Sequence, residues 1–203
     1  MKLHARVLGL EVITLAAGIG LLAIAGGGSA ADDDPKAKEI REYVLKLAEA
    51  MEKNNAAEIK AQTDALKKYD LLPIMKQLKL RDNGGIGIGQ KGTITPDGIE
   101  AKLINLARNR PPLMKPQLEK ESKDLAKAAY IMAAIAEVAK DKCPVKKKMG
   151  DKDPKDWAQW SEEMSKFSKE LAKAAEAKDV DKVKTTSAKL NGACNACHGV
   201  FRD

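Results

Sequence analysis

The sequence predicts an all-α protein, an antiparallel four-helix bundle with an extra N-terminal helical segment and a glycine-rich loop. Apolar residues recur at the three- and four-residue spacing of amphipathic helices in most of the chain after residue 34. Proline, glycine and asparagine separate these stretches, and no βαβ pattern is present. We expect short connections between the last four helices, and consecutive amphipathic helices joined in this way pack as antiparallel neighbours.

The N-terminal helical segment is predicted to begin at Asp34, where an N-cap residue is followed by Pro35 at the first helical position. The first helix is expected to extend to about Lys53. Its apolar face consists of Ile40, Val44, Leu47 and Met51. A second helix is expected over residues 56–69, followed by an apolar stretch that Pro73 interrupts.

Five glycines between residues 84 and 92 predict an irregular loop. Their alternation with Ile86 and Ile88 is weakly similar to a dinucleotide-binding fingerprint, but that site needs a preceding strand and a following helix within a βαβ unit. We therefore expect a flexible loop. Thr95-Pro96 with Asp97 is predicted to open a short helix that ends at residues 110–112.

Three longer helices are predicted in the C-terminal half of the chain. The first begins at Pro116, the second at Asp153-Pro154, and Asp179 is expected to cap the third. The inner face of the first is rich in alanine, which permits close helix approach or leaves space for a flat ligand. The apolar stripe of the first helix consists of Leu118, Leu125, Ala129, Met132 and Ala136. That of the second helix consists of Trp157, Trp160, Met164, Phe167 and Leu171. The inner side of the third helix carries Val183, Leu190, Cys194, Cys197, His198 and Phe201.

Composition and charge limit the classes of function. The chain has 203 residues, of which 44% are hydrophobic and only 3% aromatic, so a group other than large rings is expected to fill part of the core. The formal net charge is +7, with acidic residues interspersed among the basic ones. This balance favours acidic protein partners and is not that of a nucleic-acid-binding protein.

Residues 1–31 are predicted to be a signal peptide. Lys2 and Arg6 give a positive start, residues 12–25 are mainly apolar, and residues 28–31 are small. We therefore expect a periplasmic protein after cleavage. The alternative is an uncleaved membrane anchor, which Glu11 and the glycines of this segment weaken.

The chemistry-bearing motif lies near the C-terminus, where Cys194, Cys197 and His198 form a C-x-x-C-H sequence. This is the attachment pattern of haem c. On a helix, residues three and four apart share one face, so both thiols can form thioethers with one porphyrin edge. His198 is then placed as an axial iron ligand. The sequence therefore predicts one covalent haem c with His198 on the iron.

Three other chemistries are compatible with parts of the motif. A structural zinc site needs four ligands, and the only further soft or imidazole donors are Cys143 and His4, of which His4 leaves with the signal peptide. A thioredoxin-like pair belongs in a βαβ unit. A disulfide between residues three apart on a continuous helix is geometrically awkward and leaves His198 without a role. We therefore favour haem.

The segment CNACHGVFR at residues 194–202 resembles the end of class II c-type cytochromes, the cytochrome c prime family. The resemblance is clear over the last two helices and looser from Pro116. It implies a four-helix bundle with one covalent haem, held by Cys194, Cys197 and His198, and it matches Arg202 to the family's basic residue one turn further on. Phe201 is expected to pack near the porphyrin. Residues 32–110 are then an N-terminal helical region and residues 111–203 the haem-binding helices.

These features predict an electron carrier that exchanges electrons with redox partner proteins. The alternative is a five-coordinate haem protein or sensor that binds NO or CO. An enzyme is not expected, because after signal removal His198 is the only histidine and no distal histidine is left to move protons. The resemblance also implies a homodimer.

For several other residues the sequence leaves more than one role open. A sixth ligand could come from Met51, Met75, Met114 or Met132, although methionines at helical spacing are usually core residues. Trp157, Trp160 and Phe167 are expected in the core, where they could shield the haem. The run 146–148, three lysines, could dock an acidic redox partner or simply be solvated. Cys143 is either a buried free thiol or a site of intermolecular pairing.

Overall fold

The computed structural model describes residues 34–202, and the predicted signal peptide lies outside them. Within this range the chain forms helices and no strands, apart from two isolated bridges that pair Leu80 with Gly98 and Met149 with Lys152. The α-helices are α1 (Pro35–Glu52), α2 (Ala56–Leu66), α3 (Leu71–Met75), α4 (Ile99–Arg108), α5 (Lys115–Ala139), α6 (Pro154–Glu176) and α7 (Val180–Phe201). Two 3₁₀ turns, η1 (Lys76–Leu78) and η2 (Arg81–Asn83), follow α3. The all-α prediction is confirmed.

The predicted helix starts are present where side chains can cap them. Asp34, Asp153 and Asp179 each accept a hydrogen bond from a backbone N–H in the first turn of α1, α6 and α7. Such a bond satisfies a donor that the helix itself leaves without a partner. The second helix ends at Leu66 rather than at Tyr69, since the chain turns there before α3 begins.

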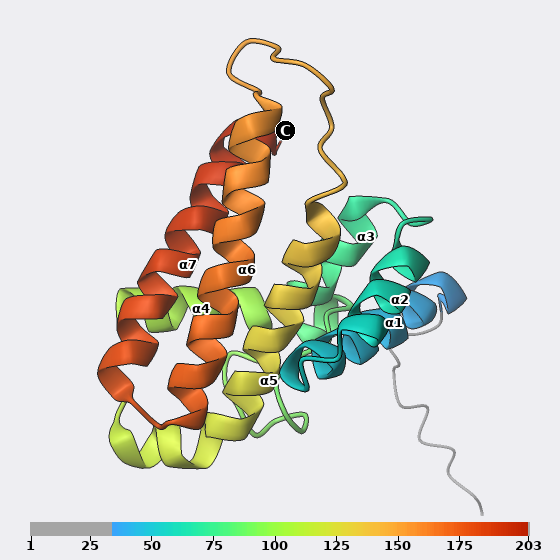
Figure 1. Ribbon diagram of the computed structural model, residues 1–203. Coiled ribbons are helices and arrows are strands. Elements are labelled where there is room, and N and C mark those ends of the chain that lie inside the picture. The colour runs from blue at the N-terminus through green and yellow to red at the C-terminus, as the bar shows by residue number, and fades with distance from the viewer. Residues whose placement is uncertain (1–33, 203) are drawn as a thin grey trace, which may run out of the picture.

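The last three helices run up, down and up, as Figure 1 shows, with α6 packed between α5 and α7. The expectation of short connections is wrong for α5 and α6, because residues 140–153 form a long loop over that end of the bundle. The turn between α6 and α7 is short, as predicted. The loop and the C-terminus of α7 lie at the same end of the molecule (Figure 1).

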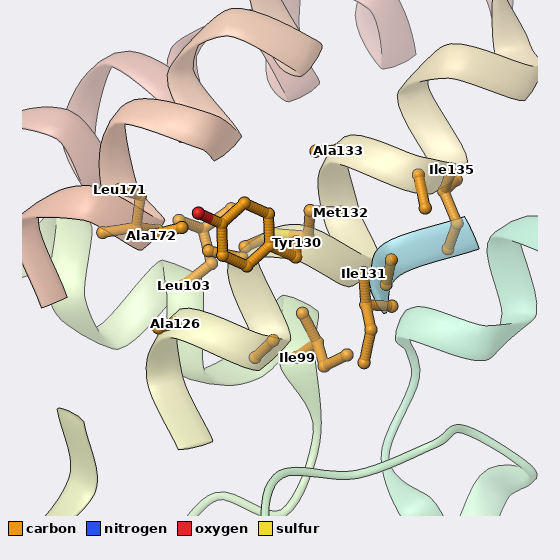
Figure 2. Close-up of a cluster of buried hydrophobic side chains, with 14 of the residues drawn as sticks. Ile99, Leu103, Ala126, Tyr130, Ile131, Met132, Ala133, Ile135, Leu171 and Ala172 are labelled. Atoms are coloured by element: carbon orange, nitrogen blue, oxygen red, sulfur yellow. The ribbon is translucent and has the colours of Figure 1, made fainter. Parts of the chain in front are cut away.

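The N-terminal region shares the core of the bundle. α1 packs on α5, α2 packs on α1, and α4 packs on α7. One cluster of buried side chains runs from Ile40 in α1 to Leu190 in α7. α5 is therefore buried on most of its circumference. In Figure 2, Tyr130 lies on the side of Leu171 and Ala172 of α6, whereas Ile131 and Ile135 lie on the other side of the cluster.

The glycine-rich loop is folded around one ion pair, contrary to the flexible loop expected. Arg81 donates to both carboxylate oxygens of Asp97, from Nε at 2.7 Å and from Nη2 at 3.1 Å, and also to the carbonyl of Gly89. Asp97 accepts a further bond from the Ile88 amide at 2.9 Å. Ile88 and Ile94 are buried, so the loop contributes to the core. Asp97 thus holds the loop and does not cap α4, where Gly98 occupies the N-cap position.

None of the helices described, from residue 34 onward, is both long and apolar enough to cross a membrane.

Candidate functional site

The C-terminal turns of α7 bring the motif together as predicted. Cys194, Cys197 and His198 all lie within this one helix, which runs unbroken to Phe201. Cys194 and Cys197 are half-buried, and His198 is partly covered but more exposed than either cysteine. All three cysteines of the chain, including Cys143, are free thiols. The motif therefore sits at a helix end that is accessible from one side and walled on the other.

Burial keeps both motif thiols protonated. It raises the pKa of Cys194 to about 12, with smaller contributions from the charges of Cys197 and Glu100. Burial also raises the pKa of Cys197 to about 11, and the remaining contribution comes from Cys143. Cys143 belongs to the loop of residues 140–153, so this loop lies near Cys197.

His198 is surrounded by charges from three segments. Partial burial lowers the pKa of His198, the positive charges of Arg202 and Lys79 lower it further, and Glu100 opposes them. Since a neutral imidazole nitrogen is the form that coordinates iron, the lowered pKa favours the ligating form.

Glu100 reaches the motif from α4, which packs against α7. Its carboxylate forms an ion pair with Lys79, with 2.6 Å between Nζ and Oε2. Sequence reasoning missed both residues, because neither belongs to a recognisable motif and they are distant from residues 194–198 along the chain. Their charges act on the site only because the tertiary fold places the start of α4 beside α7.

Aromatic packing fixes the end of α7 to the rest of the bundle. The Phe201 ring meets Trp157 edge-on at 5.0 Å and Trp160 at 6.1 Å between centroids. Trp157 is buried, and its Nε1 donates to the carbonyl of Ala139 at 2.8 Å. Phe201 thus ties the motif to both ends of the loop of residues 140–153.

Phe167 lies elsewhere on α6. Its ring contacts the ammonium groups of Lys166 and Lys189, with 5.8 and 5.9 Å from Nζ to the ring centroid. Lys189 stands more than two turns before His198 on α7. Of the three aromatic residues of α6 considered as a shield for the haem, Trp157 and Trp160 therefore pack at the motif end.

The candidate methionine ligands are distributed over different parts of the fold. Met51 and Met132 are buried in the core, and Met132 lines a small cavity of about 10 Å³ within the bundle. Met114 is 62% exposed and precedes α5, at the bundle end opposite the loop of residues 140–153. Met75 is half-buried on α3, and the carbonyl of Tyr69, two residues before this helix, accepts a hydrogen bond from Lys142. Of the four, only Met75 lies on an element tied to the motif end.

The donor set fits a covalently attached haem. Two free thiols three residues apart can reach the two vinyl positions of one porphyrin edge, and the adjacent imidazole can coordinate the iron. A Cβ added at Gly192 or at Gly199 would meet no heavy atom within 4 Å, so the backbone flanking the motif borders open space.

A comparison with family models matches residues 102–202 to the family described as cytochrome c′. This part of the chain belongs to the cytochrome c′ family. The match begins within α4 and includes α5, α6 and α7, so the motif lies inside it. The resemblance inferred from residues 194–202 is confirmed, and the class of protein is a c-type haem protein. Neither the curated proteins nor the solved structures gave a match.

Proposed function

We propose that the chain is an exported cytochrome with one covalent haem c that carries single electrons. The observation that supports this proposal is the placement of Cys194, Cys197 and His198 on the last turns of one helix, at an accessible end of the bundle. An electron carrier needs a cofactor whose edge comes close to the protein surface. Export rests on the predicted signal peptide of residues 1–31.

Each group around the motif has a distinct task in this proposal. The thiols of Cys194 and Cys197 would hold the porphyrin, and the imidazole of His198 would coordinate the iron. When bound, the haem supplies an iron that cycles between the ferric and ferrous states. Arg202, Lys79 and Glu100 set the local potential through their charges, since these charges already act on His198. We propose no substrate chemistry, because no second histidine follows the signal peptide.

Binding of a diatomic gas is the second candidate function. It is favoured by the positions of Met51, Met132 and Met114, which are in the core or at the far end of the bundle. If no methionine coordinated the iron, the bound haem would be able to take NO or CO as a ligand.

The experiment that separates the two functions is an optical spectrum of the mature protein, produced with the c-type maturation machinery. Ferric and dithionite-reduced spectra are recorded before and after addition of carbon monoxide. For an electron carrier with a protein ligand on both faces, we expect sharp low-spin bands that carbon monoxide does not change. Broad high-spin bands that shift with the gas favour gas binding. A protein without haem absorbance contradicts both functions.

A further inference from the structure

The loop of residues 140–153 presents an exposed basic and apolar tip at the end of the bundle that carries the motif. Lys146, Lys147 and Lys148 are exposed, and the following Met149 is 59% exposed. The loop also contains acidic residues. The Nζ of Lys148 lies 3.9 Å from the Oδ2 of Asp153, and Asp151 is exposed. The three adjacent lysines nevertheless leave the tip itself positively charged.

The tip has a defined conformation. Met149 and Lys152 exchange two backbone hydrogen bonds, of 2.9 and 3.0 Å, which close a tight turn. Gly150 occupies this turn with φ +58°, a left-handed conformation that suits glycine because it has no Cβ. The turn holds Met149 outward next to the lysines, so an apolar side chain stands within a basic surface.

The two ends of the loop are anchored to the bundle. Trp157 donates to the Ala139 carbonyl where the loop begins, and Lys142 donates to the carbonyls of Tyr69 and Lys67 at 2.5 and 3.1 Å. Phe201 of α7 packs on the same Trp157. The loop that carries the tip is therefore anchored beside the helix end that carries Cys197 and His198.

From this arrangement we propose that residues 146–149 are the docking surface for an acidic redox protein, an inference that rests on the proposed electron-carrier function. A transient electron-transfer interface needs a small apolar centre, a charged rim and a short path to the cofactor. Met149 provides the centre and the lysines provide the rim. The partner is a protein whose own redox centre lies beneath a carboxylate-rich surface. One electron leaves the reduced partner and enters the ferric haem, so the partner is oxidised and the iron reduced by one electron, with no bond made or broken.

The test uses a reduced plant-type ferredoxin, an acidic one-electron donor, as the probe. Stopped-flow absorbance follows reduction of the full haem-loaded chain at low ionic strength. One variant reverses the charge of the loop, with Lys146→Glu, Lys147→Glu and Lys148→Glu. A control with the same net charge carries Lys169→Glu, Lys173→Glu and Lys184→Glu, exposed positions on the half of α6 and α7 remote from the motif.

We expect the loop variant to be reduced about tenfold more slowly than the parent and the control to change by about twofold or less, because rim charges act mainly on association rates. Added salt should remove the difference. If ferredoxin reduces the parent rapidly and both variants are slowed equally, the docking proposal is overturned and the electron-carrier function is not. The same holds if neither variant is slowed. If dithionite reduces the haem of the parent but ferredoxin does not, the electron-carrier function fails together with the docking proposal.

Discussion

In residues 34–98 the helices after α1 are short and polar pairs fix the chain between them, whereas in residues 99–202 the three long helices α5, α6 and α7 pack largely through small side chains. The first region depends on contacts such as Arg81 with Asp97 and Lys68 with Glu39. In the second, the buried alanines of α5 allow its neighbours to approach closely. The motif lies in the second region, yet the charges of Lys79 and Glu100 reach it from around the border between the two. We therefore expect the C-terminal region to be sensitive to added side-chain volume and the N-terminal region to be sensitive to the loss of polar pairs.

The largest effect is expected from the motif itself. In the double variant Cys194→Ala and Cys197→Ala, covalent haem should be lost completely, because no thioether can form. Acid-acetone extraction of the purified protein measures it, since only covalent haem stays with the chain. Cys143→Ala is the control, and it should keep its haem. Equal retention of haem by the double variant and the parent contradicts covalent attachment.

Overpacking the alanine face tests the C-terminal region. Ala133 is fully buried in α5, and Ala133→Leu should lower the free energy of unfolding by about 2 to 3 kcal/mol, because the added atoms have no space. Urea denaturation of the haem-loaded protein measures this change. The same substitution at the exposed Ala158 of α6 should change little. A neutral Ala133→Leu would mean that the helices are less closely packed than the structure shows.

The ion pair of the glycine-rich loop tests the N-terminal region. Burial alone would raise the pKa of Asp97, but hydrogen bonds from Arg81 and the Ile88 amide outweigh it and leave the pKa below its usual value. The folded-state pKa is thus below the unfolded value of about 3.9, so this stabilisation is present above that pH and lost as the pH falls through the folded pKa.

Asp97→Asn should therefore lower the free energy of unfolding at pH 7 by about 2 kcal/mol, and the difference from the parent should shrink as the solution is acidified. Denaturation midpoints recorded between neutral pH and pH 3 provide the measurement. Asp82→Asn in the same loop, whose carboxylate is 83% exposed and 3.4 Å from Lys91, should be almost neutral at every pH. A pH-independent loss in Asp97→Asn would indicate a steric cause.

The smallest effect concerns the charges that act on the motif from Glu100 and Lys79. Glu100→Gln should raise the reduction potential, because a nearby carboxylate favours the ferric state, and the free energy of reduction should change by about 1 kcal/mol or less. Lys79→Gln should lower the potential for the opposite reason. Spectroelectrochemical titration measures both. Shifts of the same sign would indicate that the broken ion pair changes the structure rather than the local charge.

The sequence indicated the helices most reliably where capping and periodicity agree. Asp153 with Pro154, and Asp179, mark the starts of α6 and α7, because a capping side chain and a fixed proline φ act within one turn. Local capping preferences could not predict the role of Asp97. Its carboxylate was available to cap α4, but Arg81 is sixteen residues away in the chain and binds it bidentately.

By itself, the sequence determined the attachment motif, since the spacing of Cys194, Cys197 and His198 on a helix already places the three groups on one face. The family match over residues 102–202 agrees with it. Only the tertiary structure decided what surrounds the motif: Glu100 and Lys79 from upstream, Cys143 and the basic tip from the loop, and Phe201 against Trp157. The physical reason is that helical spacing is a local property of the chain, whereas the charges and walls of a site depend on packing between segments far apart in sequence.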